Sequence, residues 1–250
     1  MNRFKNKLAL ITGASKGIGK SIAIGLAQES SNILFTYFRD KQNAEKTKSE
    51  VLGLGVKCEM IKINLSDVKE VEKITAHIKD NYKSLDFLIN NAATGININS
   101  DKLTSKHWDW VLNTNSKAPW LLVKNLTAIM PEGSSVINIS SLGSSKVLSN
   151  YFSVGVSKSA LETITKYLSI ELGSRGIKVN SISPGIIKTS ALDSFPKGSD
   201  VNKSSNYQTP AGKPLDAKDV SNLVNFLCSK ESNMIRGQNI IIDGGQSLTI

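Results

Sequence analysis

The chain has 250 residues, of which 40% are hydrophobic and 21% charged, and this composition is typical of one α/β domain with a sizeable core. No apolar run approaches the length of a membrane span or an export signal, so we expect a cytoplasmic protein without membrane contact. Cys58 and Cys228 are too few and too far apart for a disulfide framework. The net charge of +10 suits an anionic ligand or an acidic protein partner, with a solvated lysine-rich surface as the alternative. Scattered lysines argue against nucleic acid.

Short apolar segments alternate with amphipathic ones along most of the chain. Strands are expected at 8–12, 32–37, 58–64, 85–90, 134–140, 178–183 and 239–243. Helices are expected at 17–30, 40–52, 67–82, 104–129, 150–174 and 216–229. This alternation predicts a doubly wound Rossmann fold, a seven-stranded parallel sheet flanked by helices, as a single domain over 1–250. Residues 190–213 are rich in Ser, Asn, Lys and Pro, and are either a substrate lid or a surface loop.

A glycine-rich turn follows the first strand and runs directly into a helix. Glycines permit close backbone approach, and the free N–H groups of a helix start attract phosphate, so the turn favours dinucleotide binding over a purely structural role. The expected cofactor contacts are Gly13, Ser15, Lys16, Gly17, Ile18 and Gly19.

The end of the second strand favours NADP(H). An NAD site generally has a carboxylate there for the ribose 2′-hydroxyl, whereas a 2′-phosphate needs cations. Tyr37 stands near that position, with Arg39 beside it and Lys16 in the glycine turn. Asp40 leaves NAD open, because a small shift in register would let its carboxylate reach the ribose.

Two later strands end in amides, at Asn64-Leu65 and at Asn90-Asn91-Ala92. Ligands cross an open parallel sheet at the carboxyl ends of its strands, so Asn64, Leu65, Asn91 and Ala92 are candidate cofactor contacts. Their alternative role is that of ordinary strand terminators.

Tyr151 and Lys158 open a helical pattern and lie about two turns, or roughly 10 Å, apart on one face. A phenol can give a proton, and a nearby cation favours its ionised form. The pair is therefore a candidate acid site, with a solvated surface pair as the alternative.

The order and spacing of several motifs resemble the short-chain dehydrogenase/reductase superfamily over practically the full length. The matching pieces are the glycine turn at 12–19, Asn-Asn-Ala at 90–92, Asn115, Ser140-Ser141, the segment Val179–Gly185 with Thr189, Arg236-Gly237-Gln238 and Asp243-Gly244-Gly245. The resemblance implies cofactor contacts from Lys158, Pro184, Gly185, Ile187 and Thr189. It also implies that Ser141 touches substrate and that Asn115 organises a water chain at a helix kink, unless that amide only joins two helices.

One departure from the superfamily pattern is informative. The usual Tyr-x-x-x-Lys motif would place tyrosine at 154, where this chain has Val154, which cannot donate a proton. Tyr151, one turn earlier, is the evident substitute, and its Tyr-x6-Lys spacing resembles the enoyl-acyl-carrier-protein reductase III family. Further motifs along the chain also resemble that family: His107-Trp108-Asp109-Trp110, Ser140–Ser144, Thr209–Gly212 and Met234–Gln238.

The resemblance implies reduction of the trans-2 double bond of enoyl thioesters by NADPH in fatty-acid synthesis. Tyr151 would stabilise the enolate oxygen, while Lys158 would hold the nicotinamide ribose and lower the pKa of the phenol. Hydride then goes to the β-carbon, farther from that oxygen than in ketone reduction, and a one-turn shift moves the tyrosine Cα by about 4.5 Å, comparable to the added separation.

The implied partners are an enoyl group on acyl carrier protein or coenzyme A, and a second copy of the chain in a homodimer or homotetramer. The alternatives are a 3-oxoacyl-acyl-carrier-protein reductase, another short-chain carbonyl or alkene reductase, or a nonenzymatic NADP(H)-binding regulator. No metal is expected, because His77 and His107 have no partner at metal-ligand spacing.

Overall fold

The computed structural model describes residues 2–187 and 208–248, whose strands form one seven-stranded sheet in the order β3-β2-β1-β4-β5-β6-β7. Every pairing between neighbours is parallel. The strands are β1 (Leu8–Ile11), β2 (Asn32–Tyr37), β3 (Cys58–Lys62), β4 (Phe87–Asn90), β5 (Ser135–Ile139), β6 (Lys178–Pro184) and β7 (Asn239–Ile242). The expected doubly wound parallel sheet is confirmed, and the strand boundaries differ from expectation by two residues or fewer.

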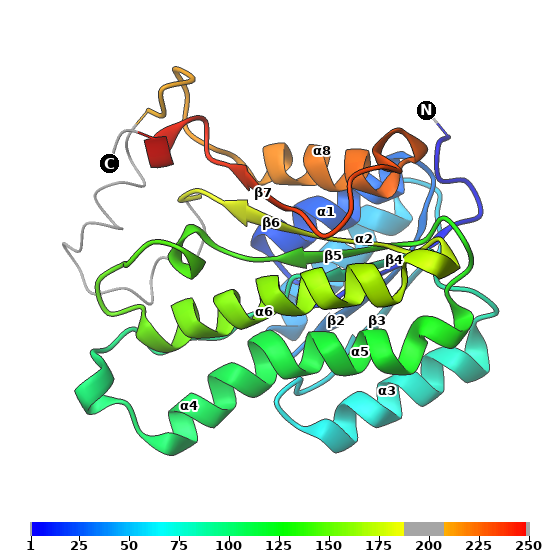
Figure 1. The fold of residues 1–250 in the computed structure, drawn as a ribbon. Helices are drawn as coiled ribbons and strands as arrows, with labels where there is room; N and C mark the ends of the chain where they lie inside the picture. The colour runs from blue at the N-terminus through cyan, green and yellow to red at the C-terminus, as the bar shows by residue number, and fades with distance from the viewer. Residues whose placement is uncertain (1, 188–207, 249–250) are drawn as a thin grey trace.

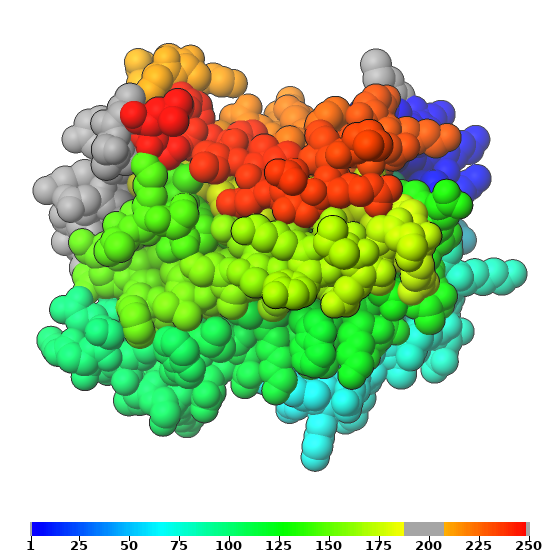
Figure 2. All heavy atoms as spheres, viewed as in Figure 1, coloured from blue at the N-terminus to red at the C-terminus, as the bar shows by residue number. Residues whose placement is uncertain are grey.

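Helices cover both faces of the sheet. The α-helices are α1 (Gly17–Gln28), α2 (Lys41–Leu52), α3 (Val68–Asn81), α4 (Ser105–Leu112), α5 (Ala118–Leu126), α6 (Phe152–Glu171) and α8 (Ala217–Cys228). A π-helical turn, η2 (Asn113–Lys117), joins α4 to α5. The short 3-10 helices are η1 (Ser100–Lys102), η3 (Thr127–Ile129), η4 (Leu142–Ser144), η5 (Gly173–Arg175), η7 (Lys230–Ser232) and η8 (Gln246–Leu248). Figure 1 shows α1, α2 and α8 on one side of the sheet and α3, α5 and α6 on the other. In Figure 2 the side chains of α4 to α6 form a continuous outer layer below the C-terminal segment.

The core explains why the central strands are apolar without alternation. Successive side chains of a strand point to opposite faces, and both faces of this sheet are covered. Leu8 and Leu10 of β1 therefore join the core under α3 and α5, whereas Ala9 and Ile11 join the core under α1 and α8.

The sheet reverses its winding between β1 and β4. The chain runs from β1 to β2 and β3 on one side, and then continues with β4 on the other side of β1. In open sheets of this kind ligands bind outside the carboxyl ends of the strands at that point of reversal. The turns after β1, β4 and β5 lie at these carboxyl ends.

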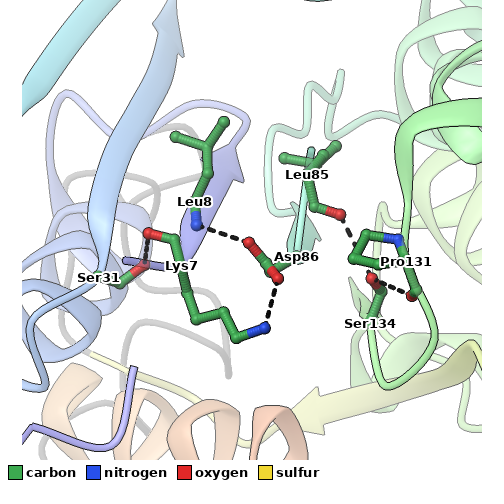
Figure 3. Close-up of polar contacts among 7 residues, drawn as sticks. All are labelled: Lys7, Leu8, Ser31, Leu85, Asp86, Pro131 and Ser134. Atoms are coloured by element: carbon green, nitrogen blue, oxygen red, sulfur yellow. Dashed lines mark hydrogen bonds and ion pairs between the residues drawn. The ribbon is translucent and has the colours of Figure 1, made fainter. Parts of the chain in front are cut away.

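Asp86 joins β1 to β4 at the amino ends of these two strands. Its carboxylate is buried, and it accepts hydrogen bonds from Lys7 Nζ at 2.8 Å and from the backbone N–H of Leu8 at 2.9 Å (Figure 3). Nearby, Ser134 donates a 2.6 Å hydrogen bond to the Pro131 carbonyl (Figure 3). These contacts fix the starts of the strands whose far ends form the candidate site.

Asp86→Ala is expected to lower the free energy of unfolding by about 2 kcal/mol, because it leaves a buried N–H without its acceptor. Thermal unfolding measures the loss. Since Asp86 is remote from the carboxyl edge, the folded variant should keep the turnover of the parent protein. Lys7→Ala is the matched control and should cost less, because the lysine is half exposed and the Leu8 contact survives.

None of the described helices is long and apolar enough to cross a membrane. Both cysteines are free thiols, Cys228 buried and Cys58 half-buried. The expected lid at 190–213 falls mostly outside the described residues.

Candidate cofactor site and active site

The glycine turn is hydrogen-bonded to the two residues that directly follow β4. Thr12 Oγ1 accepts hydrogen bonds from the backbone N–H groups of Asn91 and Ala92, both at 3.0 Å. The Asn91 side chain donates to the carbonyls of Thr12 and Gly13, both at 2.9 Å. Gly13 has φ 68°, and a β-carbon there would lie 2.9 Å from the Ala92 Cα. Asn91 and Ala92 therefore shape the turn that was expected to hold the cofactor.

The first turn of α1 presents unsatisfied backbone donors. Lys16 is its N-cap residue and provides no side-chain hydrogen bond to the helix. A β-carbon at Gly19 would lie 2.5 Å from Asn91 Nδ2, so only glycine allows the helix to approach this closely. The Ser15 carbonyl accepts a 3.0 Å hydrogen bond from Thr47, while Gly17, with φ 59°, and Ile18 are half-buried beside it. Open N–H groups at a helix start fit a pyrophosphate.

The end of β2 carries the side chains expected to select the dinucleotide. Tyr37 is buried, whereas the Arg39 guanidinium is exposed and stacks 5.0 Å from the Phe38 ring. Asp40 caps α2: hydrogen bonds from the side chain and backbone N–H of Asn43, with smaller help from Lys16, lower the pKa of its carboxyl. Asp40 is therefore engaged in the helix cap and in a 3.6 Å ion pair with Lys16 Nζ. That Arg39 and Lys16 bind a 2′-phosphate stays a prediction.

Four of the remaining expected cofactor residues, Asn64, Leu65, Pro184 and Gly185, lie at or just after the ends of β3 and β6. Asn64 Oδ1 accepts a hydrogen bond from the Ser66 hydroxyl at 2.8 Å, and Leu65 is buried beside it. Pro184 ends β6, and the Gly185 N–H donates to the Ile242 carbonyl at 2.9 Å. Ile187 is buried in the core, and Thr189 lies outside the described residues.

Tyr151 and Ser141 meet at the start of α6. Tyr151 is half-buried as the N-cap residue, and its hydroxyl donates to Ser141 Oγ at 3.3 Å. Burial raises the pKa of the phenol, and the Ser141 hydrogen bond opposes that rise only in part. The expectation of a lowered phenol pKa is therefore wrong for this structure, because desolvation disfavours the phenolate.

Lys158 lies two turns along α6 and is 4% exposed. Its Nζ donates a 2.6 Å hydrogen bond to the Ile139 carbonyl at the end of β5. Burial lowers the pKa of the ammonium to about 8, against an opposing effect of Glu162. A cation held at the carboxyl edge of the sheet can bind hydroxyl groups of a ligand.

Asn115 lies in the π-helical turn, so the expected helix kink is present. Its amide donates to the Thr94 carbonyl at 2.8 Å and to Ser157 Oγ at 3.0 Å, and it accepts from the Thr94 N–H at 2.8 Å. These bonds join η2 to α6 and to the segment after β4. They match the alternative interpretation of an interhelical contact, while the role in a water chain stays a prediction.

Sequence reasoning missed the small residues that shape this site. Val154, 5% exposed, packs directly over Gly95, where a β-carbon would lie 2.5 Å from Val154 Cγ2. A β-carbon at Gly143 would lie 2.5 Å from the Tyr151 ring, and one at Gly155 would lie 2.7 Å from the Gly143 carbonyl oxygen. The glycines are visible in the sequence, but only the fold shows what each one faces.

Neither histidine lies in this site. His77 on α3 pairs with Glu59 at 3.2 Å on the surface, and His107 is half-buried in α4. Within 2–187 and 208–248, no cluster of three or more His, Cys, Asp or Glu side chains is arranged to hold a metal ion.

A parallel sheet with a glycine turn after its first strand, and Ser, Tyr and Lys side chains converging beyond β5, defines the short-chain dehydrogenase/reductase class of oxidoreductases. Residues 13–247 match the family model described as enoyl-(acyl carrier protein) reductase, and the chain belongs to that family within the superfamily. The resemblance inferred from the motifs is thereby confirmed at the level of the superfamily.

Curated relatives and solved structures agree with this class. A 3-oxoacyl-[acyl-carrier-protein] reductase from Staphylococcus aureus is 32% identical over 241 residues, which cover 96% of this chain and 97% of the relative. A short-chain dehydrogenase from Burkholderia cenocepacia, solved in complex with NADP, is 29% identical with a TM-score of 0.90, covering 98% of this chain and 100% of that one. An angucycline C-6 ketoreductase with bound NADP is also 29% identical with a TM-score of 0.90, covering 99% and 98%. The NADP(H) expectation agrees with the last two.

Proposed function

We propose that the protein is an NADPH-dependent reductase of trans-2-enoyl thioesters. The observation that carries this proposal is the position of the tyrosine at the start of α6, one turn before the position that the superfamily pattern gives it. Val154 is buried where the superfamily pattern has its tyrosine, and the Tyr151 hydroxyl reaches Ser141 from one turn earlier. An acid set back in this way suits an oxygen that is two carbons farther from the carbon that accepts hydride.

The residues around the glycine turn fit a dinucleotide. Gly13 and Gly19 leave spaces that a β-carbon would fill, and α1 begins without a side-chain cap. Lys16 and Arg39 would hold the 2′-phosphate, and Lys158 the hydroxyls of the nicotinamide ribose. The reduced cofactor supplies a hydride for the β-carbon of the substrate.

Tyr151 and Ser141 would act at the thioester oxygen. Ser141 Oγ accepts from the Gly143 N–H at 3.1 Å and from the Tyr151 hydroxyl, which leaves the serine's own proton to donate. As hydride adds to the β-carbon, the double bond shifts and negative charge develops on the oxygen. The Ser141 hydroxyl donates to that oxygen, and the Tyr151 hydroxyl does so as well once its proton turns from Ser141 Oγ to the substrate. These two neutral donors stabilise the developing charge more strongly than they stabilise the ground-state carbonyl. The α-carbon then takes a proton from solvent or from Tyr151.

The raised pKa of Tyr151 is compatible with this chemistry. A phenol that stays protonated through the neutral pH range is a competent hydrogen-bond donor to an enolate. The role does not require the phenolate that the sequence interpretation had favoured.

A second candidate is reduction of 3-oxoacyl thioesters. It is favoured by the curated relatives, because the Staphylococcus aureus protein carries that name at 32% identity. In that reaction hydride and proton go to adjacent atoms, and the acid would have to act from Tyr151 instead of position 154. A nonenzymatic regulator is the weaker alternative, since these relatives are named as reductases.

An NADPH oxidation assay with crotonyl and acetoacetyl thioesters separates the two candidates. We expect turnover of the crotonyl substrate, faster with NADPH than with NADH. Activity with the acetoacetyl thioester alone would contradict the proposal and establish the second candidate. The same double bond on coenzyme A and on acyl carrier protein tests the carrier.

The positive charge of the chain supports an acidic acyl carrier protein as the partner. Turnover of carrier-bound substrate is then expected to fall steeply as salt is raised, while turnover of the coenzyme A thioester changes little. Equal salt dependence would remove the support for a carrier partner. A cytoplasmic location and a dimer or tetramer stay predictions.

A further inference from the structure

We propose that Gly143 is a positioning residue for Tyr151, because the absence of a side chain at 143 sets where the phenol lies. A β-carbon built at Gly143 would lie 2.5 Å from both Cδ1 and Cε1 of the tyrosine ring. The φ angle of Gly143 is not in the left-handed region, so the backbone conformation does not itself require glycine. What requires glycine here is the aromatic ring seated on its α-carbon.

The ring has little room to yield. The Tyr151 hydroxyl donates a hydrogen bond to Ser141 Oγ, and Ser141 Oγ also accepts a hydrogen bond from the Gly143 N–H. Its backbone is fixed at the helix start, where the Tyr151 carbonyl accepts a 2.7 Å hydrogen bond from the Gly155 N–H. Tyr151 is therefore fixed by hydrogen bonds at its hydroxyl and at its backbone. A methyl group at position 143 would contact the ring between these two points.

Gly155 extends the same arrangement to the helix. A β-carbon at Gly155 would lie 2.7 Å from the Gly143 carbonyl oxygen, so the η4 turn packs directly on α6. Ser159 strengthens this contact, since its hydroxyl donates to the Ser144 and Gly155 carbonyls. Two glycines, one on each element, thus allow the turn, the helix and the ring to pack without intervening side chains.

This inference rests on the proposed function, in which the Tyr151 hydroxyl stabilises the enolate. Gly143→Ala should displace the ring and lower kcat by about 10²-fold, since a misplacement of about 1 Å is known to have effects of that size. The KM for NADPH should change little, because the cofactor residues lie on other turns. The matched control is Gly173→Ala, where a β-carbon meets nothing within 4 Å and φ is unexceptional.

A double-mutant cycle distinguishes positioning of the hydroxyl from general damage. Gly143→Ala should slow the parent protein strongly and have little further effect on Tyr151→Phe, which has no hydroxyl to misplace. Equal slowing of both backgrounds would overturn the inference. Full activity in Gly143→Ala beside a large loss in Tyr151→Phe would also overturn it while leaving the proposed function intact. Full turnover in Tyr151→Phe itself would instead remove the proposed function, and with it any hydroxyl to position.

Gly155→Ala provides a second variant if Gly143→Ala fails to fold. Alanine favours a helix interior, so this change should retain folding while it pushes η4 away from α6. We expect a smaller fall in kcat with the same dependence on the Tyr151 hydroxyl. An unchanged kcat in folded Gly155→Ala would overturn the proposal.

Discussion

Tyr151→Phe is expected to lower kcat for enoyl thioester reduction by about 10²–10³-fold, the effect of removing one donor from an oxyanion site. The substitution keeps the ring that packs on Gly143 and removes only the hydroxyl, which donates a hydrogen bond to Ser141 Oγ. Stopped-flow measurement of NADPH oxidation at saturating substrate gives the loss in the chemical step. NADPH affinity and the melting temperature should stay near those of the parent, so that a fall in either would point to structural damage instead.

The double substitution Tyr151→Phe with Val154→Tyr tests whether the position of the phenol matters. It returns tyrosine to the usual position of the superfamily, where the buried Val154 side chain now packs over Gly95. We expect no recovery of crotonyl reduction, because the hydroxyl would start one helical turn from its present site. Recovery to the rate of the parent would show that the displaced tyrosine has no special reach, and it would weaken the assignment to conjugate reduction.

The fold could be predicted from the sequence because its signals are local. Each buried parallel strand is a short apolar run, and several helices begin at a capping residue, as α2, α3 and α8 do at Asp40, Asp67 and Asp216. The strand Asn32–Tyr37 was predicted with both of its boundaries. The π-helical turn at Asn113–Lys117 interrupts what the periodicity predicted as one helix over 104–129, since the amphipathic pattern continues through it.

The site could be predicted only in part, because its decisive contacts are tertiary. Tyr151 and Ser141 were each candidate site residues from their motifs, and the hydrogen bond between their hydroxyls is known only from the structure. The direction of the pKa shift of Tyr151 did not follow, because burial depends on every neighbouring element. The role of Gly143 could not be predicted either, because the Tyr151 ring that it contacts is eight positions away in sequence and adjacent only in the fold.

Lys158 is expected to cause an alkaline limb, a fall at high pH, in the pH profile of kcat/KM for NADPH. Burial lowers the pKa of its ammonium to about 8, so the charged form is present below that pH and is lost as pH rises through it. If the charge holds the ribose hydroxyls, kcat/KM for NADPH should fall above about pH 8, because that parameter reports groups of the free enzyme. Lys158→Met should lower kcat/KM by at least about 10²-fold and abolish the limb. An alkaline limb that persists in Lys158→Met would assign it to another group.

The same shift predicts a separate effect on stability with the opposite pH dependence. The folded state holds Lys158 with a pKa near 8, whereas the unfolded chain has its usual value of 10.5, so the unfolded chain binds more protons between these values. The burial penalty is therefore fully present below about pH 8 and is relieved as pH rises towards 10.5. Between about pH 7 and about pH 10, the unfolding free energy of the parent should rise relative to that of Lys158→Met, because other titrating groups cancel in the difference. Parallel curves for the two proteins would show that Lys158 is not a buried ammonium, and the alkaline limb would then need another origin.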